Sequence, residues 1–308
     1  MQIAVQSGGI IEHVGKEKCY EYIARAGFTA IDWQAVEHAL PKQNIRELKI
    51  SGSIYERPVD EVIAHFEEEA ALIHRHGLTI TQAHAPFPAY IAGHPELLDI
   101  MIEVYLKVIR VCDRYGCKNL VVHGASLSLS DEEQTLESVW DMNMRLYSAM
   151  IPTLLECNVT VCLENLVSKH AGYMEAHCTD PYEAVRMIDT LNEMAGREVF
   201  GFCLDIGHMA LAANDFRKYV PILGKRIKAL HIHDNDCHAD SHLAPLTGKI
   251  PWKTVCKCLR QIGYSGDLSF ETFRQAETAI MFDEELLLPW LNLIRQTGEV
   301  FRKHIRAE

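Results

Sequence analysis

Residue types that bind metal ions or exchange protons recur in this sequence, each at the end of an apolar, strand-like run. Six short segments carry them: AHAPF, VVHG, CLEN, CLDIGH, LHIHDND and FETF. The residues are His84, His123, Glu164, Asp205 with His208, His231 with His233, and Glu271. One such histidine is usually a hydrogen-bonded structural residue, but six consecutive occurrences are hard to assign to chance. Imidazoles and carboxylates together bind Mn²⁺, Zn²⁺, Co²⁺ or Mg²⁺, and carboxylates also transfer protons, so the pattern predicts a metal-dependent enzyme.

Strand-like runs alternate with segments of helical periodicity along the whole chain. The runs are Ile3–Gln6, Phe28–Trp33, Leu78–His84, Asn119–His123, Val159–Asn165, Val199–Asp205, Ile227–His233 and Leu268–Thr272. Between them lie apolar helical stripes, such as the one from Leu97 to Val111, and helix starts at Asp180–Pro181 and near Ser130. Eight β/α units imply a parallel sheet that can close, so the expected fold is α/β, a (β/α)8 TIM barrel.

The alternative architecture is an open, doubly wound sheet, which would carry a glycine-rich phosphate turn after its first strand. Ser7-Gly8-Gly9 is too short to be that turn, which favours the barrel. A barrel takes about 250 residues. We therefore expect residues 1–308 to form one barrel domain with a C-terminal helix, and no linker or low-complexity tract suggests a boundary.

Strand alternation predicts where the candidate side chains point. Two residues before each candidate, on the same inward face, stand small or medium side chains. These are Val121, Cys162, Cys203, Ala229 and Ser269, whereas Leu163, Leu204 and Phe270 should face the helices. The carboxylates would then enter the mouth of the barrel, where burial without a partner is costly. A divalent cation is the natural compensation.

Composition excludes several other classes of protein. The formal net charge of −12 disfavours a protein whose affinity comes from nucleic-acid phosphates. The ten cysteines include no C-x-x-C pair, so we expect reduced core thiols rather than disulfides or a zinc ribbon. No apolar run approaches the length that spans a bilayer, and Met1–Ser7 reads as a strand rather than a signal peptide. We expect a cytoplasmic protein without a membrane partner.

From Leu78 to Glu271 the motifs resemble those of the xylose isomerase-like barrel superfamily. It contains sugar and sugar-phosphate isomerases and epimerases, and zinc endonucleases that cut DNA at abasic sites. The resemblance to the epimerases implies that the metal ligands are Glu164, Asp205, His231 and Glu271, and that the two glutamates exchange protons with the substrate. His208 would contact substrate or a further ion. The segment DNDCHADSHLAPLTGKIPW resembles the one that covers the barrel mouth.

The endonuclease branch uses three zinc ions, and this chain offers candidates for its longer ligand set. Beyond the four ligands above, that set would add His84, His123, His208, Asp240 and His242, so more than one ion is expected. A DNA-cutting enzyme also needs basic loops around the mouth. The loop after His123 has no Lys or Arg before the next helix, and the loop after His231 has only Lys249, although Lys42, Arg46, Lys49 and Arg57 follow the second strand.

The leading hypothesis is isomerisation or epimerisation of a small sugar or sugar phosphate through an enediolate, with Glu164 and Glu271 as the proton-transfer pair. The alternative is a zinc-dependent abasic-site endonuclease. Further side chains expected at the substrate are His84, His123, His208, His233, Trp33, Phe87, Trp252 and Arg274. Ordinary packing explains the aromatic residues equally well, and a surface salt bridge explains Arg274. His231 is favoured over His233 as the ligand, and His238 as a solvated loop residue. The family often forms homo-oligomers.

Overall fold

Eight parallel strands form one sheet in the computed structural model, which describes residues 1–127, 134–168 and 174–306. The order is β10-β1-β2-β3-β4-β5-β8-β9. The strands are β1 (Ile3–Gln6), β2 (Ala30–Trp33), β3 (Thr79–His84), β4 (Asn119–Val122), β5 (Thr160–Glu164), β8 (Phe200–Asp205), β9 (Ile227–His231) and β10 (Leu268–Phe270). Ile232 N donates to Ser269 O at 2.9 Å and Glu271 N donates to Ile232 O at 3.0 Å, which joins the two ends of the sheet. The (β/α)8 barrel predicted from the sequence is confirmed.

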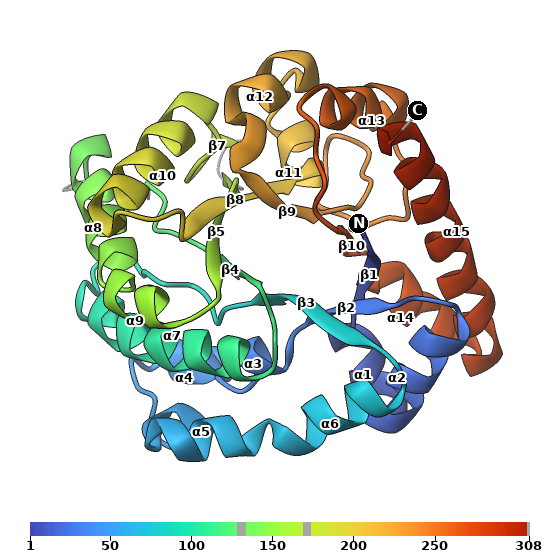
Figure 1. The fold of residues 1–308 in the computed structure, drawn as a ribbon, viewed down its shortest axis with the longest axis horizontal. Helices are drawn as coiled ribbons and strands as arrows, with labels where there is room; N and C mark the ends of the chain where they lie inside the picture. The colour runs from blue at the N-terminus through green and yellow to red at the C-terminus, as the bar shows by residue number, and fades with distance from the viewer. Residues whose placement is uncertain (128–133, 169–173, 307–308) are drawn as a thin grey trace.

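Helices surround the strands as a ring (Figure 1). The longer ones are α2 (Lys16–Arg25), α6 (Glu67–Arg75), α7 (Glu96–Arg114), α8 (Leu136–Ser148), α10 (Pro181–Ala195), α12 (Phe216–Leu223), α13 (Trp252–Gln261), α14 (Phe273–Phe282) and α15 (Leu287–Arg306). The shorter ones are α1 (Gly8–Val14), α3 (Ala35–His38), α4 (Lys42–Arg46), α5 (Val59–His65), α9 (Ile151–Glu156) and α11 (Ile206–Leu211). Strands β6 (Val167–Ser168) and β7 (Met174–Glu175) pair as a small antiparallel ribbon.

Local sequence signals fix the helix starts. Asp180 caps α10 by accepting a hydrogen bond from Tyr182 N at 2.9 Å, with Pro181 at the first helical position, as predicted. The start predicted near Ser130 lies outside the described residues. The helix that follows it, α8, begins at Leu136, where Thr135 and Ser138 form a capping box.

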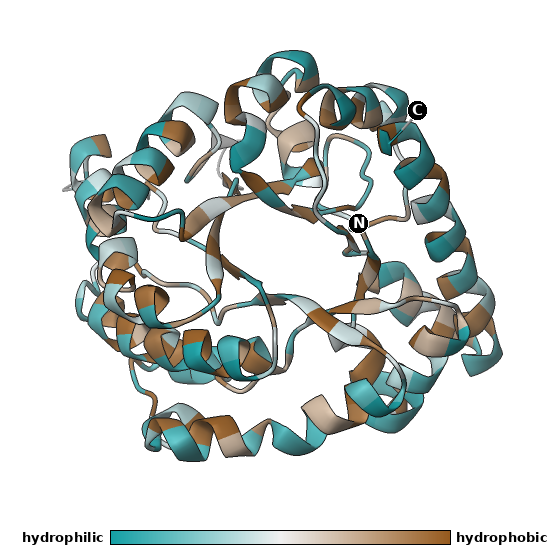
Figure 2. Ribbon diagram, viewed as in Figure 1, coloured by the Kyte–Doolittle hydropathy of each residue, from teal (hydrophilic) through white to brown (hydrophobic). Residues whose placement is uncertain are grey.

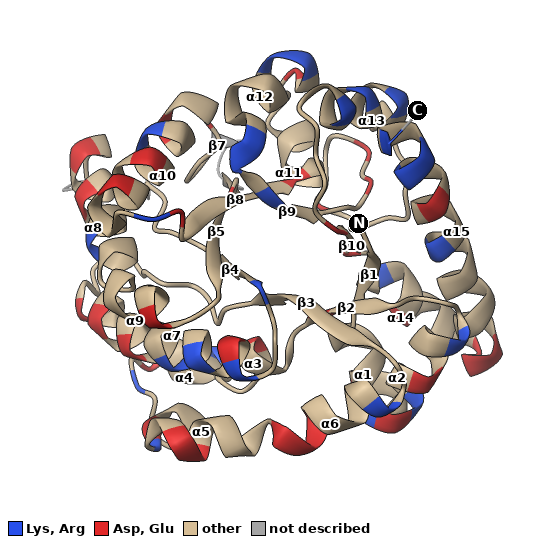
Figure 3. Ribbon diagram, viewed as in Figure 1, with Lys and Arg blue, Asp and Glu red and all other residues tan. Residues whose placement is uncertain are grey.

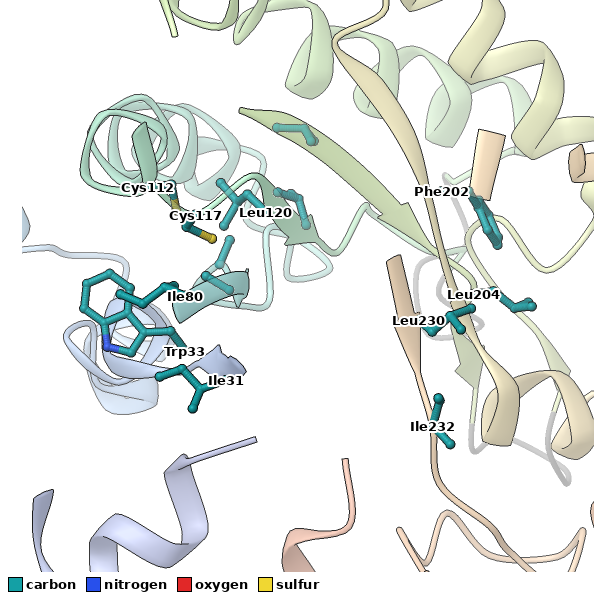
Figure 4. Close-up of a cluster of buried hydrophobic side chains, with 14 of the residues drawn as sticks. Ile31, Trp33, Ile80, Cys112, Cys117, Leu120, Phe202, Leu204, Leu230 and Ile232 are labelled. Atoms are coloured by element: carbon teal, nitrogen blue, oxygen red, sulfur yellow. The ribbon is translucent and has the colours of Figure 1, made fainter. Parts of the chain in front are cut away.

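The main core lies between the strands and the helix ring. Helix α7 buries its predicted stripe, including Leu97, Met101 and Val104, which are all 0% exposed. Figure 4 shows Ile80 and Trp33 on the side of Cys112, Cys117 and Leu120, with Ile31 beside Trp33, and all six belong to one core cluster. Each helix of the ring carries both hydrophobic and hydrophilic residues (Figure 2). Full burial of one such aliphatic or aromatic side chain contributes about 1.5–3 kcal/mol.

Inside the barrel, a separate cluster of small side chains fills the layer below the strand ends. It consists of Val121, Cys162, Cys203 and Ala229, as strand alternation predicted. Nine of the ten cysteines are buried free thiols, and Cys237 is exposed. The lysines, arginines, aspartates and glutamates lie mainly on the outer helices (Figure 3). None of the described helices is long and apolar enough to cross a membrane.

Candidate metal centre and active site

His231, the last residue of β9, lies at the centre of the polar cluster at the carboxyl ends of the strands. Its Nδ1 atom is 3.0 Å from Glu164 Oε1, 3.7 Å from Glu271 Oε2 and 3.8 Å from Asp205 Oδ2. The ligand atoms of Glu164, Asp205 and His231 all lie within 4.8 Å of one another. All four side chains are buried, and Glu271 is the most exposed of them at 9%. The four residues that the family resemblance implied as ligands are therefore brought together.

Asp205 is held by several contacts at the junction of β8 and α11. Its backbone exchanges two hydrogen bonds of 2.9 Å with the Asn165 side chain, and its Oδ1 accepts from His208 N at 2.6 Å, which caps α11. His233 Nε2 lies 3.1 Å from both carboxylate oxygens. A Cβ on Gly207 would lie 1.9 Å from His233 Cε1, so only glycine leaves room for this ring.

A second group of donors adjoins the centre on the side of β3 and β4. His123 Nε2 is 2.9 Å and His84 Nε2 is 3.5 Å from the same atom, Glu164 Oε2, and the two Nε2 atoms are 3.0 Å apart. His84 Nδ1 faces Ala85 O at 2.8 Å, which fixes the ring and leaves Nε2 directed at this point. One potential metal-ligand atom thus comes to this point from the end of each of three strands, β3, β4 and β5.

A third group lies on the opposite side, where the loop after β9 returns over the mouth. Asp240 Oδ2 is 3.2 Å from His242 Nε2 and 3.7 Å from His208 Nε2. His242 also stacks on His233, with ring centroids 4.1 Å apart. Asp234 anchors this loop, because its carboxylate accepts hydrogen bonds from Leu246 N at 2.9 Å, Ile250 N at 3.1 Å and Trp252 Nε1 at 2.8 Å.

Mutual electrostatics shift the pKa values of these groups strongly. Burial by itself would lower the pKa of the imidazoles, but the surrounding carboxylates raise it to about 9 for His84, about 10 for His208 and about 9 for His242. Burial opposes ionisation of Glu164, yet His231 and His123 hold its pKa well below the usual range. The neighbouring imidazoles thus stabilise the ionised form of the Glu164 carboxylate.

The donor set fits divalent cations. Two imidazole Nε2 atoms 3.0 Å apart that both face one carboxylate oxygen are poorly satisfied by protons, because only one ring can donate along that short contact. The same convergence suits a cation with mixed nitrogen and oxygen ligands. Glu164, Asp205, His231 and Glu271 could hold one ion, and the two flanking groups offer donors for more.

A cavity of about 380 Å³ opens above the cluster. It is lined by Gln6, Gly9, Glu12, Gln34, Glu37, His38, Lys42, His84, Phe87, His123, Glu164, His208, Asp240, His242, Glu271, Phe273 and Glu277. Away from the cluster, the charged lining is mostly acidic: Glu12, Glu37 and Glu277 against Lys42, whose Nζ is 4.0 Å from Glu37 Oε1. Sequence reasoning identified Phe87 but missed Gln6, the last residue of β1, and Gln34 and Glu37, which follow β2.

Four of the expected substrate contacts do not lie along this cavity. Trp33 is fully buried and packs against Phe66, because Asp32, not Trp33, is the inward residue at the end of β2. Trp252 is buried against Phe301, and Arg274 is exposed outside the cavity. His233 is 0% exposed beneath the cluster, bonded to Asp205. His238 is exposed, as predicted for a solvated loop residue.

Comparison with known proteins places the chain in a family. Residues 20–304 match the family described as xylose isomerase-like TIM barrel, and the chain belongs to it. Among solved structures, a D-tagatose 3-epimerase-like protein superposes with a TM-score of 0.67 at 21% identity, covering 96% of this chain and 99% of that one. D-psicose 3-epimerase from Clostridium cellulolyticum H10, solved with D-tagatose, gives a TM-score of 0.70 at 15% identity, covering 98% and 99%. These likenesses establish the fold.

Curated relatives match a smaller part of the chain. The uncharacterized protein y4fM of Sinorhizobium fredii is 26% identical over 56% of this chain, and the chain spans about half of that relative, 52%. D-psicose 3-epimerase of Ruminiclostridium cellulolyticum is 23% identical over 67% of each chain. A probable endonuclease 4 of Mycoplasma pneumoniae is 26% identical over 54% of each. Both branches that the sequence motifs suggested are thus represented among the relatives.

Proposed function

We propose that this member of the xylose isomerase-like TIM-barrel family is a divalent-metal-dependent isomerase or epimerase of a small, uncharged sugar. The observation that carries the proposal is the placement of Glu164 and Glu271. Their carboxylates approach His231 Nδ1 at 3.0 Å and 3.7 Å from strands β5 and β10, at the floor of a cavity of about 380 Å³. Two carboxylates on different sides of one cation are suited to remove and return a proton at a carbon between them. The likeness to sugar epimerases adds support.

The ion would be held by Glu164, Asp205, His231 and Glu271. When bound, a divalent cation acts as a Lewis acid that stabilises negative charge on a carbonyl and its neighbouring hydroxyl, by several kcal/mol. Mn²⁺, Zn²⁺, Co²⁺ and Mg²⁺ are all compatible with this set of nitrogen and oxygen donors. The flanking groups around His123 and Asp240 would accommodate further ions or bind sugar hydroxyls.

The chain's own residues orient the two proposed bases. Gln6 Nε2 donates to Glu271 Oε1 at 2.9 Å, so Oε2 is the oxygen left to face the cluster. Glu164 has both oxygens engaged by imidazoles, Oε1 by His231 and Oε2 by His123 at 2.9 Å. Each carboxylate is thus fixed at one edge of the cavity floor. General acid and base catalysis of this kind contributes about 10²–10⁴-fold to rate.

The alternative is hydrolysis of a phosphodiester, and the two flanking donor groups favour it because they extend the ligand set to nine residues. The outer part of the cavity argues against it. Glu12, Glu37 and Glu277 line the part of the cavity away from the cluster, which a phosphate remote from the metal would have to approach. Like charges in that position repel phosphate, and no arginine of the described part of the chain lines the cavity. A neutral sugar suits this wall better.

The proposal is tested by supplying purified protein with each divalent ion and assaying a panel of ketoses and aldoses in D₂O, beside a supercoiled plasmid with abasic sites. Sugar interconversion with solvent deuterium at one carbon is the expected result. Glu164→Gln and Glu271→Gln should each lower turnover far more than substrate affinity, and should differ in which isomer still exchanges. Glu193→Gln, on the exposed face of α10, is the matched control.

Metal content has to be measured on each variant, because both glutamates would be ligands. Plasmid nicking without sugar turnover would replace the proposal by the hydrolase alternative. Transfer of the substrate's own hydrogen without solvent label would indicate a hydride shift. That result would retain the metal site and eliminate the two-glutamate mechanism.

A further inference from the structure

Asp32 lies inside the barrel, directly behind the candidate metal centre. It is the inward residue near the end of β2 and is 1% exposed. Its Oδ2 accepts hydrogen bonds from Gln82 Nε2 at 2.7 Å and from Ser269 Oγ at 3.1 Å, on the neighbouring strand β3 and on β10. The same oxygen is 3.5 Å from Nε2 of His231. Oδ1 is buried and has no hydrogen-bond partner.

A carboxylate in this position needs a positive or strongly donating partner. Burial of an ionised carboxylate without one is far more costly than burial of a neutral group. The amide of Gln82 and the hydroxyl of Ser269 are neutral donors, and His231 is the group in contact that can supply a charge-assisted bond. The contact between Asp32 and His231 therefore stabilises the buried carboxylate in addition to linking two strands.

The two ring nitrogens of His231 face opposite ways. Nδ1 faces Glu164, Asp205 and Glu271, whereas Nε2 faces Asp32. A neutral imidazole carries one N–H and one lone pair, and only the lone pair can bind a cation. The nitrogen that carries the proton decides whether Nδ1 is available.

We propose that Asp32 is a positioning residue for the metal centre, which accepts the Nε2–H of His231 and thereby keeps the lone pair of Nδ1 directed at the ion. This inference rests on the metal site of the proposed function. A carboxylate behind a ligating histidine fixes the tautomer and the ring orientation and makes the other nitrogen more basic. Loss of such a partner typically lowers metal affinity by about 10–100-fold.

The test compares Asp32→Asn with Ser269→Ala. Asparagine keeps the size of the side chain but removes the charge facing Nε2. The alanine variant removes one hydrogen bond to the same Oδ2 atom and leaves the contact with His231 intact. Affinity for Zn²⁺ or Mn²⁺ is measured by competition with a chelator, together with the melting temperature of the metal-free proteins. We expect Asp32→Asn to weaken binding by about 10–100-fold and Ser269→Ala to stay near wild type.

Nitrogen NMR of the histidine rings gives a second measurement that needs no variant to fold. In zinc-loaded wild type, His231 should show Nδ1 bound to metal and Nε2 protonated. Binding through Nε2, or unchanged zinc affinity in folded Asp32→Asn, would overturn the inference. Equal losses of zinc affinity in Asp32→Asn and Ser269→Ala would also overturn it, since they would indicate that Asp32 only stabilises the packing of the strands. If wild type bound no divalent ion at all, the metal site of the proposed function would fail, which is a distinguishable result.

Discussion

Gly207→Ala provides a sharp test of how the metal centre is supported. The new Cβ would lie 1.9 Å from Cε1 and 2.5 Å from both ring nitrogens of His233, whose Nε2 contacts the Asp205 carboxylate at 3.1 Å. Forcing a methyl group into such a space costs about 1–3 kcal/mol. Displacing the ring also removes a hydrogen bond to a charged group, worth about 1.5–3 kcal/mol. We therefore expect metal-free Gly207→Ala to lose about 2.5–6 kcal/mol of stability, a large fraction of a domain's total.

A double-mutant cycle separates this steric effect from other causes. His233→Ala removes the ring, and with it the three atoms that lie nearest to the new Cβ of Gly207→Ala. Gly207 lies in α11 without a positive φ, and alanine in a helix is favoured over glycine by about 0.5–1 kcal/mol. The same substitution should thus be destabilising in wild type and neutral or slightly stabilising beside His233→Ala. Urea unfolding in the presence of a chelator measures both values. Equal costs in the two backgrounds would refute the reasoning.

Three further predictions follow from the site and its surroundings. Asp205→Asn keeps an oxygen to cap α11 but loses a charged ligand, so metal content and activity should fall together, as metal analysis beside the sugar assay would show. Gly124→Ala would place a Cβ 2.5 Å from the His177 ring and 2.6 Å from Asn143 Oδ1, and should cost about 1–3 kcal/mol in urea unfolding. Burial lowers the pKa of His177 to about 3, so as the pH falls the unfolded chain takes up this proton before the folded protein does. The stability that the neutral, buried His177 contributes is therefore complete above about pH 6.5 and is lost as the pH falls toward 3. A His177→Gln variant should show a flatter decline in that range.

The sequence predicted the barrel and most of the cluster because both depend on short-range periodicity. Alternation along β5 and β8 places Glu164 and Asp205 inward above Cys162 and Cys203, and the structure has this arrangement. Trp33, in β2, was expected beside the substrate, whereas the structure directs Asp32 inward there and buries Trp33 against Phe66. Register would have corrected this, because Asp32 pairs with inward Gln6 and with Gln82.

Long-range contacts explain what periodicity could not predict. The candidate loop residues Asp240 and His242 are placed over the mouth by Asp234, whose carboxylate binds backbone groups 12 and 16 residues further along the chain. No repeat in the sequence marks such a hub. His233 is two residues after His231, yet the chain leaves the strand between them and Gly207 admits the ring below the cluster. The direction of that side chain depends on a glycine from another β/α unit.

The type of positive charge in the cluster carries a functional argument of its own. A purely structural network of buried carboxylates is most firmly neutralised by arginine, which cannot lose its proton. Among the described residues, each of Glu164, Asp205, Asp240 and Glu271 has an imidazole partner, and the lysine that lines the cavity, Lys42, lies beside Glu37. Neighbouring carboxylates raise the pKa of His208 and His242, against the effect of burial, to about 10 and about 9, so protons hold the charge balance until a cation replaces them. Because a ligating imidazole must be neutral, cation binding and proton release are the same exchange. Among the described residues, the positive charges of the cluster can be released in this way, which supports the proposal that the cluster binds a metal ion.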